Sequence, residues 1–244
     1  MVTTVLTAAR VVGLFAALGA LMRETWLLRA PGTLPIARLV QRELRPKLRA
    51  GQVALCTIAG VLLVAAPIGW SITLGDLELV RDPQWRLASI LALVATVIVK
   101  VLWVLFEELA FRAAMITVLA RRVGLGLGVT IAVSAAAFAA AHGRDAMSAA
   151  VLIVDGIGFG VAYVATGGIR APIAWHLSKN LAVWILTGQS TLQFATLPWR
   201  LVGESPTAWV ELSFAVLIVG LTSVLLMRSM RISTPVAHRE PVQS

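Results

Sequence analysis

The chain has 244 residues, of which 59% are hydrophobic and only 14% are charged, and its formal net charge is +9. Soluble domains carry about 25% charged residues, so these totals exclude an ordinary soluble domain and favour an integral membrane protein. The apolar stretches are continuous and do not alternate, so helices are the predicted spanning elements. We interpret the positive charge as loop charge beside anionic lipid headgroups and not as a nucleic-acid surface. The single cysteine, Cys56, excludes a disulfide within the chain.

Seven apolar stretches each have about the 20 residues that a helix needs to cross a bilayer. They lie at approximately 2–22, 51–70, 88–106, 124–142, 147–166, 171–188 and 209–227. We therefore predict an all-α fold, a polytopic transmembrane helical bundle with about seven spans, or eight if one further helix is present. A removed signal peptide is the alternative for the first stretch, but the dense positive charge after it favours a retained anchor.

Basic residues are concentrated in alternate loops. The segment 23–49 holds seven basic residues, further arginines mark the turns at 121–122 and 170, and three more arginines follow position 227. The loops between them carry little net positive charge. The positive-inside rule then predicts an outside N-terminus and a cytoplasmic C-terminus in a multi-pass cell membrane protein. Composition and short loops favour a bacterial plasma membrane.

The stretch VLWVLFEELAFRAAM, at 101–115, places three charges in a segment otherwise suited to lipid. Charged side chains at membrane depth are costly and are often functional. Glu108 and Arg112 are four residues apart, in the order that favours an ion pair along one helix face. Glu107 points about 100° away around the helix, so it is left free to face a cavity. A structural ion-pair network between helices is the alternative.

Two later segments place further polar side chains at helical spacing. In FAAAH, Phe138 and His142 are four residues apart, so the aromatic ring can pack against the imidazole and orient it. In HLSKN, His176 and Asn180 have the same spacing, and both can donate hydrogen bonds toward one point. The alternatives are a histidine satisfied at a helix end and hydrogen bonding between helices. We interpret Lys179, off that face, as a solvated or snorkelling charge.

Together these clusters supply one carboxylate, two imidazoles and one amide on three separate helices. Such a set is suited to activating a water molecule and holding an oxyanion. Glu107 with His142 could take a proton from water, and His176 with Asn180 could stabilise the negative oxygen of a tetrahedral intermediate. Straight helices, at about 1.5 Å per residue, would leave the two histidines at different depths from Glu107, so a bent helix or shorter spans are required.

Two other features concern helix contacts. The glycine-rich segments GLGLG, at 124–128, and GIGFG, at 156–160, fit the small-xxx-small pattern of close packing between membrane helices. Asp155 lies alone in the middle of its predicted helix. We expect it to pair with Arg112 or Lys100, with a catalytic role as the less favoured reading.

The three motifs EELAFR, FAAAH and GGIRAPIAWHLSKNL occur in an order that resembles a known family. They match the patterns EExxxR, FxxxH and HxxxN of the CAAX protease and bacteriocin-processing family of intramembrane endopeptidases, also called CPBP or Abi. The Ras-converting CAAX prenyl endopeptidase is the eukaryotic relative. The resemblance covers about residues 87–188, and the ordered triple is far more specific than EExxxR alone.

The resemblance implies a role for each matching residue. Glu107 would be the base that activates water, and His142 would help to place that water. His176 and Asn180 would form the oxyanion hole. No cofactor is expected. Zinc held by Glu107, His142 and His176 is the alternative, but the chain lacks HExxH, and the asparagine is easier to explain without a metal.

Three further residues would support this site. Glu108 and Arg112 would form the structural pair that sets Glu107, and Phe138 would pack against the histidine of its motif. The implied activity is hydrolysis of a peptide bond in a lipid-anchored, CAAX-type substrate or a hydrophobic leader-type substrate, by water that the glutamate activates. A non-catalytic membrane scaffold or immunity protein is the first alternative, and a small proton-coupled transporter is the second.

The expected partners are a membrane-associated peptide or protein substrate and membrane lipids, with no nucleic acid. We expect four regions along the chain. They are N-terminal transmembrane helices with a basic cytoplasmic loop at 1–86, a catalytic helical core at 87–188, a loop and the last transmembrane helix at 189–227, and a disordered cytoplasmic tail at 228–244.

Overall fold

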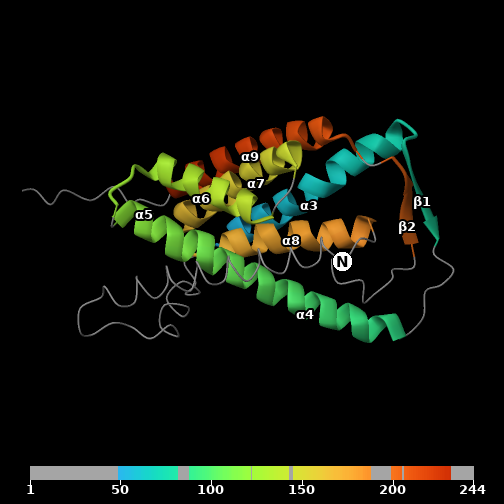
Figure 1. The fold of residues 1–244 in the computed structure, drawn as a ribbon, viewed down its shortest axis with the longest axis horizontal. Coiled ribbons are helices and arrows are strands. Elements are labelled where there is room, and N and C mark those ends of the chain that lie inside the picture. The colour runs from blue at the N-terminus through green and yellow to red at the C-terminus, as the bar shows by residue number, and fades with distance from the viewer. Residues whose placement is uncertain are drawn as a thin grey trace, which may run out of the picture.

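The structure, a computed structural model, describes residues 49–81, 88–121, 123–142, 145–187, 199–204 and 206–231. In Figure 1 the helices run side by side along the long axis of the molecule, and two short strands lie together at one end. The predicted first span at 2–22, most of the basic loop after it and the tail beyond Arg231 lie outside the described residues.

The elements follow the order α3 (Ala50–Thr73), β1 (Leu77–Arg81), α4 (Ala88–Glu108), η1 (Leu109–Ile116), α5 (Thr117–Arg121), α6 (Leu127–His142), α7 (Ala146–Thr166), α8 (Arg170–Thr187), β2 (Trp199–Gly203) and α9 (Ala208–Arg231). Every predicted stretch after the first therefore contains a helix. By length and hydropathy, 3 described helices could cross a membrane, namely α3, α7 and the Ala208–Ser229 part of α9, and α6 is a shorter apolar helix. A mostly helical fold is confirmed, but a count of seven or eight spans is not.

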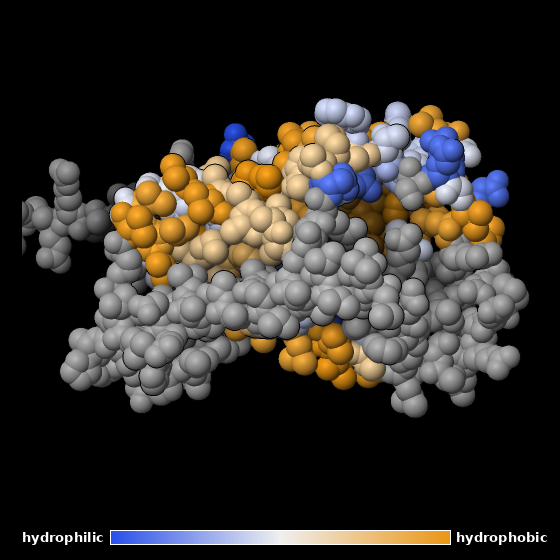
Figure 2. Space-filling view, viewed as in Figure 1, coloured by the Kyte–Doolittle hydropathy of each residue, from blue (hydrophilic) through white to orange (hydrophobic). Residues whose placement is uncertain are grey.

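Large apolar side chains on the outer faces of the helices remain exposed. They include Ile98 and Leu102 on α4, and Leu217 and Leu221 on α9, each more than half exposed. Figure 2 shows hydrophobic surface over the described helices on the face in view. Contiguous apolar surface of this kind is rare on soluble monomers and is what lipid requires, so the chain is an integral membrane protein.

The two strands correct the purely helical prediction. β1 and β2 pair antiparallel, with Leu77 opposite Gly203, in a segment that we expected to be loop. Leu77 is buried, whereas Leu79, which follows it on the same face of the strand, is exposed, so β1 packs against the helices only at its start. Gly203 closes the end of the ladder with a φ of 125°, and a Cβ there would overlap the carbonyl oxygen of Asp76. Only glycine therefore fits this position without strain.

The predicted disordered tail is wrong for its first residues, because α9 continues through them. Ser229 lies in the last turn of α9, and its hydroxyl donates to the Leu226 carbonyl oxygen at 2.7 Å. Gln52, in the first turn of α3, donates to the same hydroxyl at 3.1 Å. These bonds hold the end of α9 beside the start of α3, so the helix is supported beyond its apolar part.

Glycines allow close helix contacts at two places. A Cβ at Gly156 would lie 2.9 Å from Cα of Ala135, so GIGFG does pack α7 tightly against α6. A Cβ at Gly60 on α3 would overlap the Trp175 carbonyl oxygen on α8. The other predicted motif, GLGLG, makes no such contact among the described residues: Gly124 has a φ of 75° and open space around it, so it serves the turn before α6.

Three features bring the catalytic candidates to one depth. α4 continues directly into the π-helical segment η1, which begins at Leu109, immediately after Glu108, and changes the direction of the following side chains. α6 has only 16 residues, so His142 at its end lies inside the bundle. The α7–α8 turn is compact: Gly168 and Ile169 are buried, Arg170 at the start of α8 is exposed, and His176 follows within the next two turns. The short helix and the irregular helix thus allow Glu107 and the two histidines to approach one another, which straight helices of full length would not.

Candidate active site

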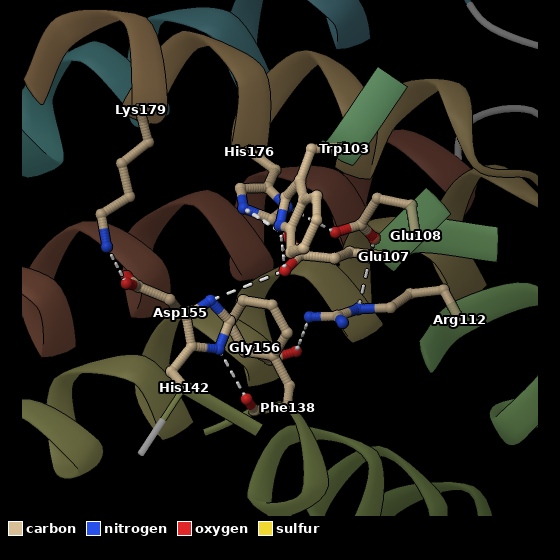
Figure 3. Close-up of polar contacts among 10 residues, drawn as sticks. All are labelled: Trp103, Glu107, Glu108, Arg112, Phe138, His142, Asp155, Gly156, His176 and Lys179. Atoms are coloured by element: carbon tan, nitrogen blue, oxygen red, sulfur yellow. Dashed lines mark hydrogen bonds and ion pairs between the residues drawn. The ribbon is translucent and has the colours of Figure 1, made fainter. Parts of the chain in front are cut away.

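The centre of the site is the Glu107 carboxylate, which lies between two imidazoles (Figure 3). Its Oε1 is 3.7 Å from Nε2 of His142 on α6, and its Oε2 is 3.5 Å from Nε2 of His176 on α8. Glu107 itself is 4% exposed, whereas the His142 side chain is 28% exposed. Three helices therefore meet at one buried carboxylate, and the His142 side is the open one.

Trp103 provides the direct hydrogen bond to this carboxylate. Its Nε1 donates to Glu107 Oε1 at 2.8 Å, from one turn earlier on α4. This contact was not among the predicted site contacts. The i,i+4 spacing of an indole donor and a carboxylate on one helix face was the signal that could have found it.

The second glutamate of the motif orients His176 and also pairs with the arginine. Glu108 Oε1 lies 2.8 Å from Nδ1 of His176, and Glu108 Oε2 lies 3.3 Å from Nε of Arg112. Arg112 in turn donates from Nη2 to the carbonyl oxygen of Gly156 on α7, at 3.4 Å. All of Glu108 and Arg112 is buried. One buried chain of polar contacts thus links η1, α7 and α8.

Aromatic rings enclose these charges. The Arg112 guanidinium lies 4.7 Å from the centre of the Phe138 ring and 5.2 Å from that of Phe159. Phe159 stacks on His176 with 4.8 Å between ring centres, and Phe138 lies 4.5 Å from His142. Cation–π contact compensates part of the desolvation of a guanidinium, which matters because Arg112 Nη1 has no hydrogen-bond partner among the described residues.

The hydrogen bonds indicate where the histidine protons lie. Nδ1 of His142 is 2.8 Å from the Phe138 carbonyl oxygen, which can only accept, so this nitrogen carries the proton. Nδ1 of His176 faces the Glu108 carboxylate and carries a proton for the same reason. When either ring is neutral, its Nε2 presents a lone pair toward Glu107. At 3.5 to 3.7 Å these atoms are too far apart for a direct hydrogen bond, and a water molecule that donates to both of them would connect them.

Two other polar residues of α8 make no contact with the Glu107 carboxylate. Asn180 lies one turn beyond His176 on α8, is partly buried and makes no hydrogen bond within the described part of the chain. Lys179 forms an ion pair with Asp155, so the predicted pairing of Asp155 with Arg112 or Lys100 is wrong, and Lys179 is not a solvated charge. The physical reason is geometric: α7 and α8 are neighbours, and Lys179 has the length to reach the buried carboxylate.

No metal cluster is visible in the described ranges, where no three His, Cys, Asp or Glu side chains are grouped to hold an ion. The Nε2 atoms of His142 and His176 both approach oxygens of Glu107. A cavity of about 390 Å³ lies elsewhere, between α3, α7, α8 and α9, and Asp155 and Lys179 line it.

A buried carboxylate between two imidazoles, inside an apolar helical bundle, defines an integral membrane protein with a polar centre suited to hydrolysis. The sequence model of one protein family, described as Type II CAAX prenyl endopeptidase Rce1-like, matches residues 85–182 of the chain. The match confirms the resemblance predicted from the three motifs, and it supports a peptidase. Comparisons with curated proteins and with solved structures gave no match.

Proposed function

We propose that the protein is an intramembrane endopeptidase in which Glu107 activates the attacking water. The observation that carries this proposal is the contact of one buried carboxylate with Nε2 of both His142 and His176. A carboxylate and two imidazoles at 3.5 to 3.7 Å form a centre that can accept and return protons. The family match supports the reaction class, and the geometry supports the assignment of roles.

In the first step, a water molecule donates one hydrogen bond to Glu107 Oε1 and one to Nε2 of His142. This position is favoured because both atoms are acceptors, and the exposed edge of His142 gives access for water. Glu107 takes the proton as the water oxygen attacks the scissile carbonyl carbon. The proton then passes to the leaving amine when the tetrahedral intermediate collapses, which releases two peptide products and restores the carboxylate.

His176 stabilises the oxyanion that forms in this step. The Glu108 carboxylate accepts from Nδ1, and in this step Nε2 carries the hydrogen that is donated to the developing negative oxygen. Asn180 supplies the second donor from the next turn of α8. Its lack of a hydrogen bond to any described residue leaves its amide available for this role. Glu108 and Arg112 act as the positioning pair, and Phe138 packs against both imidazoles.

The proposed mechanism uses no metal, since each polar atom around Glu107 already has a role. Zinc bound by Glu107, His142 and His176 is the competing mechanism, in which the metal would polarise the water. The two mechanisms differ in their response to a zinc chelator, which should stop only the metal-dependent reaction.

The proposed substrate is a peptide that reaches the site from the membrane, through a lipid anchor or a hydrophobic segment. Trp103, 40% exposed beside Glu107, lies on the apolar outer face of α4, where lipid-borne chains arrive. We also propose that the C-terminus is cytoplasmic. Arg49, Arg170 and Arg228 are all exposed at the end of the bundle where α3 and α8 begin and α9 ends.

The decisive experiment is cleavage by the purified protein in lipid vesicles, with prenylated CAAX-type peptides and hydrophobic leader peptides as separate substrates. Glu107→Gln keeps the shape of the side chain but removes the base, so cleavage should be lost while the helix content and unfolding midpoint stay close to wild type. Glu204→Gln makes the same chemical change at an exposed residue and should leave the rate unchanged.

Cleavage of neither peptide class by wild type, or equal cleavage by Glu107→Gln, would overturn the proposal. A non-catalytic scaffold should show no hydrolysis with any peptide and should keep its binding partner in Glu107→Gln. A proton-coupled transporter should instead lose pH-driven flux in this variant, without any peptide product. The two substrate arms decide between lipid-anchored and leader-type substrates.

A further inference from the structure

The cavity beside the Asp155–Lys179 pair has the character of a ligand site. Its volume of about 390 Å³ lies within the range of small-molecule pockets. Apolar side chains from three elements form much of its wall, including Leu63 and Ile68 from α3, Leu152 from α7 and Val183 from α8. None of the proposed catalytic residues lines it. The cavity is therefore separate from the reaction centre.

The charges on the cavity wall are unequal. Asp155 and Glu211 contribute two carboxylates, whereas Lys179 contributes one ammonium group, which pairs with Asp155. Glu211, on α9, lines the same cavity as this pair. With Lys179 protonated and both acids ionised, the described wall carries one excess negative charge. A cation is the ligand that would neutralise it.

One buried acceptor on this wall is also unpartnered. Asp155 is 1% exposed, and Lys179 contacts its Oδ2, but its Oδ1 has no hydrogen-bond partner among the described residues. An unpaired buried carboxylate oxygen is costly, because it has lost its water without gaining a donor. A ligand N–H group would remove that cost. A protonated amine would supply both the hydrogen-bond donor and the positive charge that the cavity wall lacks.

Exposed acids also lie beside the strand end of the cavity. Leu77 and Gly203, which face each other across the strand pair, line the cavity at the end of the bundle. The residues beside them, Asp76, Glu78 and Glu204, are all exposed acids. An acidic rim raises the local concentration of cations and repels anions.

We propose that this cavity binds an apolar chain that ends in a protonated amine, with the chain against the wall from α3, α7 and α8 and the amine between Asp155 and Glu211. The apolar walls provide the affinity for the chain, and the acids select the head group. The inference does not rest on the peptidase activity, because no catalytic residue takes part. Binding should therefore persist in Glu107→Gln.

Native mass spectrometry of the protein in nanodiscs tests this directly, with dodecylamine, dodecanol and laurate as three probes of equal chain length. We expect one dodecylamine bound per chain, in preference to the alcohol, and exclusion of laurate. Asp155→Asn should weaken dodecylamine binding by roughly ten-fold or more, the loss of a charge-assisted hydrogen bond. Lys179→Met should bind the amine at least as tightly, since a competing cation has been removed.

Two further variants keep the test decisive. The double variant Asp155→Asn/Lys179→Met removes the pair without leaving a lone buried charge, and it should lose most of the preference for amine over alcohol. Val183→Trp fills the cavity and should abolish binding, while Val216→Trp, on the exposed face of α9, should not. Tighter binding of laurate, loss of amine binding in Lys179→Met, or an unchanged preference in the double variant would overturn the inference.

Discussion

Nδ1 of His176 lies 2.8 Å from Oε1 of Glu108, so the glutamate that pairs with Arg112 along its own helix also orients a histidine from α8. The two adjacent glutamates therefore have different partners. Glu107 faces Nε2 of both imidazoles, and Glu108 holds Nδ1 of one of them. The Glu108 carboxylate is thus held by Arg112 and His176, whereas the Glu107 carboxylate is not paired with the arginine.

Removal of the Glu108 charge should destabilise the fold. Arg112 is completely buried, and Glu108→Gln would leave its guanidinium without an anionic partner at 3.3 Å. Breaking a buried pair in this way costs about 3–5 kcal/mol, measured as the free energy of unfolding in mixed micelles. The double variant Glu108→Gln/Arg112→Met should recover much of this loss. Equal stability of the single variant and wild type would contradict the structural role of the pair.

Gly60→Ala should disturb both stability and activity. The new Cβ would overlap the Trp175 carbonyl oxygen, a backbone atom of α8, so α8 must shift together with His176, the next residue. Overpacking of this kind costs about 1–3 kcal/mol, and the cleavage rate should fall as well. Gly69→Ala is the matched control on the same helix, because a Cβ there meets nothing within 4 Å. The same effect from both variants would mean that helix α3 does not position the site.

Asn180→Ala should reduce the rate without unfolding the protein. Loss of one oxyanion donor lowers kcat about 10²–10³-fold, whereas the unfolding midpoint should hardly change, since Asn180 bonds to no described residue. Ser178→Ala removes only an intrahelical bond to Trp175 and serves as the neighbouring control. If Asn180→Ala cleaves at the wild-type rate, the oxyanion donor must be another group.

Trp103→Phe should slow cleavage about ten-fold, because Glu107 loses a hydrogen bond to its charged form. The ring is kept, so the KM for a membrane-borne peptide should change less than kcat. Trp70→Phe, at an exposed tryptophan on α3, provides the control. A change confined to KM would show that Trp103 contacts substrate and does not position the carboxylate.

Prolonged dialysis against a zinc chelator should leave cleavage unchanged if Glu107 activates water without a metal. Zinc content, determined by elemental analysis of the same samples, must be followed alongside the rate. Loss of activity that returns on addition of zinc would replace the glutamate mechanism with a metal-based one. Activity that is lost and is not restored by zinc would indicate damage to the protein. A helix content equal to that of the untreated sample rules out such damage.

The motifs predicted the local contacts well. The Glu108–Arg112 pair and the approach of Phe138 to His142 are both i,i+4 relationships, which follow from helical spacing alone. Trp103 has the same spacing from Glu107 and was overlooked. Close helix packing was predicted at both glycine-rich segments; GIGFG does pack closely, against α6, whereas GLGLG lies at a turn.

Contacts between distant segments were not predictable in this way. The partner of Asp155 could be any cation that neighbouring helices bring near, and only the packing of α7 against α8 selects Lys179. The pairing of β1 with β2 joins segments more than a hundred residues apart, so neither strand has a local signal for its partner. The cavity is likewise a product of helix arrangement and has no sequence motif.

By itself the sequence determined a lipid-embedded helical chain, its candidate reactive side chains by type, and the family that 85–182 resembles, because hydropathy and short-range spacing act within one helix. Only the tertiary structure decided that Glu107 lies between His142 and His176, since short α6, the π-helical segment and the compact α7–α8 turn together set their depth. The depth and orientation of these side chains depend on how the helices pack against one another. That packing arises from contacts between distant segments, which short-range sequence patterns do not encode.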